Sequence, residues 1–152
     1  MLEITLPYLL ERYASKLPDK VGIVAEGTRL TFKQWDDDAS RVANWLSGLG
    51  VRAGERVATL FANTREALEV FFALWKIGAV LVPLNTRLTA SELQVLLEHS
   101  NPRAVVYGAN FREQVEDLKR ALPHLDYWAP PGSGELRDAP VEKPSSIVKE
   151  ID

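Results

Sequence analysis

Two Asn-Thr-Arg triplets are the residues of this sequence best suited to binding an anion. They are Asn63-Thr64-Arg65 and Asn85-Thr86-Arg87, and each follows an apolar segment typical of a β-strand. In a parallel sheet covered by helices, ligands gather at the carboxyl ends of the strands. Backbone amides, an asparagine and a guanidinium could bind a negatively charged group there. Asn63, Asn85 and Arg87 are therefore the candidate binding residues, and no catalytic residue is assigned.

A structural role is the simpler interpretation of the same residues, and we prefer it. Asn63 can cap the helix that follows it, because an asparagine oxygen accepts hydrogen bonds from first-turn amides. Asn85 and Arg87 can hold their loop through hydrogen bonds to the backbone. On this interpretation, none of the three residues binds a cofactor.

Other residue types that often carry chemistry also fit structural roles. Gly48, Gly50 and Gly54 follow a predicted helix and precede a strand, which is the reverse of the order in a dinucleotide-binding loop. No Gly-Lys-Ser or Gly-Lys-Thr sequence of a phosphate loop occurs. The two histidines, His99 and His124, are separated by a whole predicted strand–helix unit, which favours helix ends or surface over catalysis or metal binding.

A serine nucleophile and an aspartate metal site are also disfavoured. Ser40 and Ser91 fall within predicted helices with no histidine nearby. Asp36, Asp37 and Asp38 are consecutive, and consecutive helical residues point about 100° apart, so three in a row cannot face one ion. We predict that these aspartates form the solvated first turn of a helix, where acidic groups are favoured by the helix dipole.

Length, composition and charge exclude several classes of protein. The chain has 152 residues, 46% of them hydrophobic, which is enough for one core. A net charge of −3 with interspersed signs disfavours nucleic-acid binding. No cysteine is present, so disulfides and thiolate chemistry are excluded. The first residues lack the basic and long apolar regions typical of a signal peptide, and the longest apolar run, 70–75, is far shorter than the roughly 20 residues of a transmembrane helix. We expect a cytoplasmic protein.

The elements that must position these residues begin with a helix and a small hairpin. A helix starts at Thr5 or Leu6, and a hairpin with Gly27 in its turn covers 21–25 and 29–31. Thr31 then caps a long helix with Gln34 in a capping box, and Gly50 ends that helix.

Four strands follow at regular intervals, at 55–61, 79–84, 103–107 and 125–129, and helices separate them. Their apolar runs are continuous, as in parallel strands covered on both faces. Three residue pairs predict the starts of the intervening helices: Asn63 with Glu66, Thr89 with Glu92, and Asn110 with Glu113. The fold class is therefore α/β, a doubly wound and mainly parallel sheet with helices on both faces, preceded by a helix and a small hairpin. It occupies 1–129, and 130–152 is a linker or tail rich in proline and glycine.

The helix predicted at 65–77 is apolar nearly all round. Such a helix must be covered on more than one side. The sheet supplies one cover, and the N-terminal helices or a part absent from this chain must supply the other. If the second cover is missing, the exposed apolar surface should cause self-association.

Several segments in order resemble one known family. They are Leu30-Thr31-Phe32-Lys33-Gln34-Trp35, Gly50-Val51-Arg52-Ala53-Gly54-Glu55-Arg56-Val57-Ala58, Asn63, Lys76-Ile77-Gly78 leading into 79–89, Glu92-Leu93 and Ser100-Asn101-Pro102. This pattern is similar to the N-terminal part of the adenylate-forming (AMP-binding) acyl-CoA synthetases, which include the long-chain fatty-acid–CoA ligases.

The resemblance implies a parent enzyme that forms an acyl-adenylate from ATP and a carboxylate and then passes the acyl group to coenzyme A, with magnesium at the phosphates. The nucleotide-binding motifs of that family are not found in this sequence. We therefore expect no cofactor for this chain itself and interpret it as a structural, non-catalytic part of such a ligase. Its expected partner is the remainder of the ligase chain. A free-standing binding or regulatory module is the alternative, and an unrelated flavodoxin-like or dinucleotide-binding domain is a weaker one.

Overall fold

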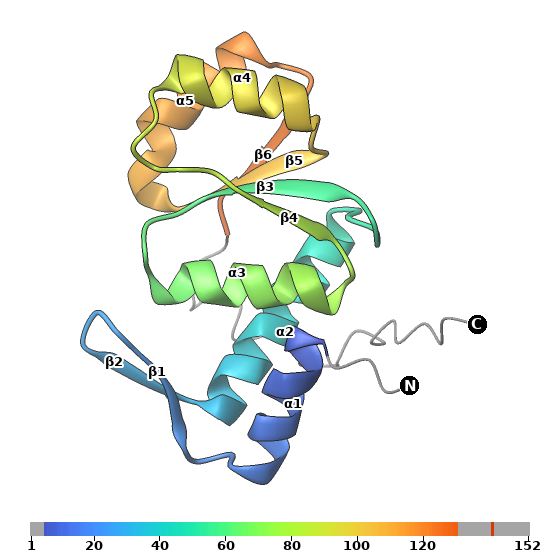
Figure 1. The fold of residues 1–152 in the computed structure, drawn as a ribbon, viewed down its shortest axis with the longest axis vertical. Helices are drawn as coiled ribbons and strands as arrows, with labels where there is room; N and C mark the ends of the chain where they lie inside the picture. Colours follow the sequence, from blue (N-terminus) through green and yellow to red (C-terminus); the bar gives the residue numbers. More distant parts are fainter. Residues whose placement is uncertain (1–4, 131–140, 142–152) are drawn as a thin grey trace.

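A computed structural model describes residues 5–130 and residue 141. Its main sheet has four parallel strands in the order β4-β3-β5-β6 (Figure 1). The strands are β3 (Arg56–Leu60), β4 (Val80–Pro83), β5 (Ala104–Tyr107) and β6 (Asp126–Trp128). They confirm the predicted parallel α/β sheet. The division at residue 129 stays a prediction, because 131–140 and 142–152 lie outside the described residues.

Helices cover both faces of this sheet (Figure 1). One layer consists of α2 (Phe32–Gly48) and α3 (Arg65–Lys76), and the other of α4 (Ala90–Ser100) and α5 (Arg112–Ala121). Successive residues of a strand point to opposite faces. Accordingly, Val57 of β3 belongs to the core under α2 and α3, and its neighbour Ala58 belongs to the core under α4 and α5.

The N-terminal elements lie outside the layer of α2 and α3 (Figure 1). They are α1 (Leu6–Lys16) and the hairpin of β1 (Val21–Ala25) and β2 (Thr28–Thr31). Glu26 and Gly27 have φ angles of 51° and 74°, so both central residues of the turn are left-handed, as tight hairpins require. The Thr31 capping box is confirmed: Thr31 Oγ1 accepts from the Gln34 amide at 3.2 Å, and Gln34 Oε1 accepts from the Thr31 amide at 2.9 Å.

Two of the predicted helix starts are each wrong by one residue. Thr64, and not Asn63, is the N-cap of α3, because its hydroxyl accepts from the Ala67 amide at 3.3 Å. Before α5, Asn110 lies inside a short 3₁₀ turn, η1 (Ala109–Phe111), and Phe111 occupies the N-cap without a side-chain hydrogen bond. The third prediction, Thr89 with Glu92 at the start of α4, is confirmed.

The second cover of α3 comes from the N-terminal helices, one of the two sources that the sequence allowed. Both α1 and α2 pack on α3. Aromatic rings fill the junctions: Tyr13 of α1 stacks on Phe32 with centroids 5.2 Å apart, and Trp35 meets Phe72 of α3 at 4.6 Å. Phe72 in turn lies 5.1 Å from Trp75.

The strand β4 departs from its prediction as a strand buried on both faces. It forms one edge of the sheet, and Val80 is 46% exposed. By contrast, all four residues of β5 are buried. Local sequence did not reveal this difference, because the place of a strand in a sheet depends on the direction of the crossovers.

Candidate functional site

The carboxyl ends of the strands remain the place where a ligand is expected. The helix after β3 covers one face of the sheet and the helix after β5 covers the other, so the topological switch point lies between these two strands. Asn63 follows β3, whereas Asn85 and Arg87 follow the edge strand β4. Only the first of the three candidates therefore comes from a strand beside the switch point.

Sequence reasoning missed Gly108, which ends β5 at this point. A Cβ atom added to Gly108 would lie 3.0 Å from Asn110 Oδ1 and 3.2 Å from Cδ1 of Phe61. The Gly108 amide also donates to the Leu60 carbonyl at 3.0 Å. The loops after β3 and β5 thus meet closely, and glycine permits the contact. A glycine directly after a buried apolar strand was the signal that could have revealed it.

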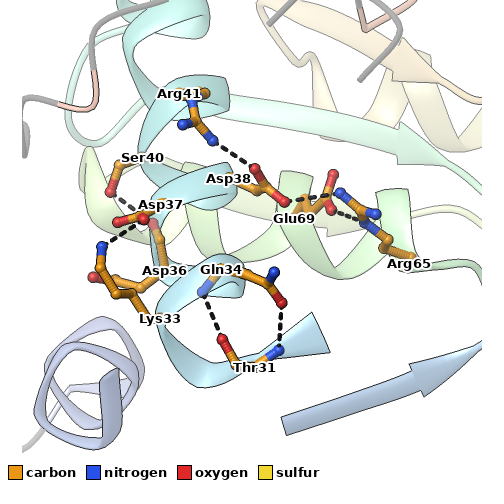
Figure 2. A network of polar contacts seen from close by, with 10 residues as sticks. All are labelled: Thr31, Lys33, Gln34, Asp36, Asp37, Asp38, Ser40, Arg41, Arg65 and Glu69. Atoms are coloured by element: carbon orange, nitrogen blue, oxygen red, sulfur yellow. Dashed lines mark hydrogen bonds and ion pairs between the residues drawn. The ribbon is translucent and has the colours of Figure 1, made fainter. Parts of the chain in front are cut away.

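In the first triplet, Asn63 is exposed and Arg65 is bound elsewhere. The Arg65 side chain turns from the strand end toward α2, where Nη2 donates to Asp38 Oδ2 at 2.8 Å (Figure 2). Its Nε pairs with Glu69, one turn further along α3. Two carboxylates therefore hold this guanidinium.

In the second triplet, the structure shows the loop-holding contact that the simpler interpretation expects. Asn85 Oδ1 accepts from the Arg87 amide at 3.0 Å, and the Asn85 carbonyl accepts from the Leu88 amide at 3.2 Å. The Arg87 side chain is exposed, and within residues 5–130 its guanidinium has no hydrogen bond or ion pair. Ligand binding by Asn63, Asn85 or Arg87 stays a prediction.

The described residues contain a row of four alternating charges between α2 and α3. Arg41 Nη1 donates to Asp38 Oδ1 at 2.7 Å, and Asp38 bridges to Arg65, which continues to Glu69 (Figure 2). Burial raises the pKa of Glu69, and Arg65 opposes that rise. Burial alone would lower the pKa of Arg65, but Glu69 and Asp38 outweigh it and raise that pKa. The row is balanced in charge and joins the two helices.

The prediction that Asp36, Asp37 and Asp38 form a solvated turn is wrong for Asp36. Its side chain is 4% exposed, and Oδ1 lies 2.7 Å from Nζ of Lys76, which is 2% exposed. Lys76 Nζ also donates to Glu11 Oε1 of α1 at 2.9 Å. We call Glu11, Asp36 and Lys76 the buried ion triad. It joins α1, α2 and α3, and sequence reasoning missed it because its members are far apart in the chain.

Among the residues that the structure describes, His99, His124, Ser40 and Ser91 are not brought together into a catalytic arrangement. His99 and His124 are exposed, and His124 lines a hollow of about 550 Å³ at the amino ends of the strands, opposite the expected ligand edge. Ser40 Oγ donates to the Asp36 carbonyl at 2.8 Å, and Ser91 Oγ lies 3.1 Å from Thr89 Oγ1. Both hydroxyls therefore have contacts within their own helices.

Two further properties concern metals and membranes. Within 5–130, no three acidic or histidine side chains gather as metal ligands do. None of the helices in the same range is both long enough and apolar enough to cross a bilayer.

Comparisons with known proteins agree with the fold. The profile of the AMP-binding enzyme family matches residues 10–147. The long-chain-fatty-acid–CoA ligase FadD13 of Mycobacterium tuberculosis is 38% identical over 67% of this chain and 21% of its own length. The fatty acid–[acyl-carrier-protein] ligase ScoC of Streptomyces coeruleorubidus is 34% identical over 78% of this chain and 23% of its own length.

A solved structure shows which part of such an enzyme corresponds to this chain. The inhibitor-bound N-terminal domain of FACL13 from Mycobacterium tuberculosis superimposes with a TM-score of 0.81 and 32% identity, over 91% of this chain and 37% of that domain. The chain therefore spans well under half of each of these relatives. It belongs to the AMP-binding enzyme family and corresponds to the N-terminal part of the fatty-acid ligases of that family.

Proposed function

We propose that this chain is the N-terminal structural part of a ligase that uses ATP to join a fatty acid to coenzyme A. The match of the AMP-binding family profile to residues 10–147 carries this proposal. Relatives named as fatty-acid ligases support the substrate class. One of them is named for an acyl-carrier protein as the acceptor, and the other for coenzyme A.

Within the parent enzyme, we assign the chain a scaffolding role. Several of its charged side chains pair with one another: Arg65 with Asp38 and Glu69, and Lys76 with Glu11 and Asp36. The contacts of Arg65 with Asp38 and of Lys76 with Glu11 and Asp36 join α1, α2 and α3. The cytoplasmic location stays a prediction.

ATP, magnesium and coenzyme A belong to the proposed parent reaction. The described residues do not fit a nucleotide site of their own, because Arg65 is held by two carboxylates and Asn85 Oδ1 is bound to the Arg87 amide. We derive no reaction step from them. We propose Asn63, Asn85 and Arg87 only as peripheral contacts, of which Arg87 has the unpaired cation within 5–130.

A pair of exchange assays tests this proposal. The first measures fatty-acid-dependent exchange of pyrophosphate into ATP by the purified 152-residue chain, and we expect none above background. The second measures the same exchange in a chimera, in which this chain replaces the matching N-terminal part of FadD13. We expect activity there.

Each assay can refute one half of the proposal. Exchange by the isolated chain would contradict a purely structural role. A folded but inactive chimera would contradict its place in a fatty-acid ligase. In a working chimera, the variant Arg87→Ala, compared with the exposed Arg112→Ala as a control, would show whether Arg87 contributes to activity.

A further inference from the structure

The two edges of the main sheet differ in how they meet solvent. At one edge, β6 has three residues and begins with exposed Asp126. Its Tyr127 hydroxyl donates to the Leu118 carbonyl of α5 at 3.0 Å and to the carbonyl of Leu122, the C-cap of α5, at 3.2 Å. At the other edge, β4 consists of Val80, Leu81, Val82 and Pro83 and carries no charge. Exposed apolar edge strands invite association, and proteins usually protect them.

The register of β4 determines which of its backbone groups face outward. The Val80 amide donates to the Glu55 carbonyl at 2.8 Å, and the Leu84 amide donates to the Thr59 carbonyl at 2.9 Å, so alternate residues from Val80 face β3. The backbone groups of Leu81 and Pro83 therefore point to the free edge. Proline has no amide hydrogen. The free edge thus presents two carbonyls and one N–H group, so a strand that pairs with it would have to supply more donors than acceptors.

Side chains around this edge are covered only in part. Val80 is 46% exposed, and Leu81 and Val82 are half-buried. An unbroken Val-Leu-Val run is typical of a strand whose two faces are both covered. The apolar character of β4 therefore fits a partner that also brings apolar side chains.

A second copy of this chain meets these needs poorly. Two β4 edges placed together would offer four outward carbonyls and only two N–H donors, by the same alternation. A different segment, free of the proline, can supply more donors. The chain spans 21% of the length of FadD13, so a ligase of that length has ample polypeptide to provide such a segment.

We propose, on the basis of the ligase role above, that the free edge of β4 is the surface on which the remaining polypeptide of the ligase docks. That segment presents N–H donors to the Leu81 and Pro83 carbonyls and apolar side chains to Val80 and its neighbours. The edge is therefore a seam within the parent enzyme, and within residues 5–130 no strand pairs with it.

Hydrogen exchange at the Leu81 amide tests this inference. Within residues 5–130 no strand pairs with this amide, so in the isolated chain it should exchange rapidly, whereas the Val82 amide, directed to β3, should be protected. In the FadD13 chimera, docking should slow exchange at Leu81 by at least about tenfold. Equal exchange rates in the isolated chain and in an active chimera would overturn the proposal. So would a dimeric isolated chain with a protected Leu81 amide.

Two matched variants locate the seam. Val80→Lys places a charge at the β4 edge, and Val95→Lys places one on α4, where Val95 is 63% exposed. Both should leave the unfolding midpoint of the isolated chain unchanged, but only Val80→Lys should lower that of the chimera and restore rapid Leu81 exchange. Equal effects of both variants would reject β4 as the seam. An inactive parent chimera would count against the ligase proposal instead, so the two failures are distinguishable.

Discussion

Replacing Lys76 by methionine should destabilise the fold more than any other single change in its charged residues. The substitution keeps an unbranched side chain of similar length but removes the ammonium from the buried ion triad. Nζ lies 2.7 Å from Asp36 and 2.9 Å from Glu11, and the side chains of Lys76 and Asp36 are 2% and 4% exposed. The variant therefore leaves a buried carboxylate beside a methyl group.

The size of the effect follows from two opposing contributions. At 2.7 Å, the attraction between Lys76 and Asp36 is about 6 kcal/mol with an effective dielectric constant of about 20. Removing each ion from water costs several kcal/mol, so the intact pair is worth little in net terms. Breaking such a pair from one side costs about 3–5 kcal/mol, because the desolvation of the remaining charge is no longer offset. That is a large part of the roughly 5–15 kcal/mol that stabilises a domain.

Urea unfolding measures this loss. With a slope of about 2 kcal/mol per molar, K76M should lower the midpoint by roughly 2 M. Lys33→Met is the matched control: Lys33 pairs with Asp37 on the same layer, but its side chain is 61% exposed. That control should cost well under about 1 kcal/mol.

The double variant K76M/D36L tests whether Lys76 and Asp36 stabilise the fold as a pair. It removes both buried charges, so it should recover most of the stability that K76M loses. If the losses in stability of the single variants K76M and D36L simply add in the double variant, the two side chains are not coupled through the triad. A loss in K76M no larger than that in K33M would show that water reaches the Lys76 side chain.

Three further changes test other parts of the fold. Thr59→Val should raise the free energy of unfolding by about 1 kcal/mol in urea, because the Thr59 hydroxyl is buried without a hydrogen-bond partner within 5–130; a loss would reveal a bound water. Thr31→Ala should cost about 1 kcal/mol by the same measurement, since it removes one half of the capping box, and Thr28→Ala in the preceding strand should cost less. Glu26→Gln should lower the pKa of Glu66 in an NMR titration, without restoring its ordinary value, because burial is the larger cause of the raised pKa and Glu26 the smaller. A glutamate whose pKa is raised on folding stabilises the protein at pH values below the ordinary glutamate pKa, and this contribution is lost as pH rises through the folded-state pKa. Glu26→Gln should therefore raise the free energy of unfolding near neutral pH and leave it unchanged in acid. An unchanged Glu66 titration would contradict this.

Local patterns predicted the elements whose causes are local. The Thr31 capping box, the Gly27 turn and the Gly50 helix end each depend on a few neighbouring residues, and the structure contains all three. The order of the strands in the sheet could not be predicted from local patterns. Val80-Leu81-Val82 has the composition of a central strand, yet it lies at an edge, because the crossovers decide which strand is outermost.

Ion pairs between residues far apart in the chain could not be predicted from the sequence either. Lys76 and Glu11 are 65 residues apart, and no periodicity connects them. The sequence predicts Asp36 as one of three solvated acids, because it does not show that Lys76 of α3 lies beside it. The candidate triplets were located at the correct strand ends, but the sequence could not show that Arg65 turns toward Asp38 instead.

The four tryptophans fall into two separate groups, and this gives the chain two optical reporters of its own folding. Trp35 and Trp75 both contact Phe72 in the packing of α2 and α3, whereas Trp45 meets Trp128 of β6 with ring centroids 6.5 Å apart. Replacing Trp45 and Trp128 by phenylalanine would leave fluorescence that follows only the helices on the N-terminal side. The complementary replacement would follow the closure of the last strand. Stopped-flow traces of the two proteins would therefore show whether the helical layer forms before the sheet is complete.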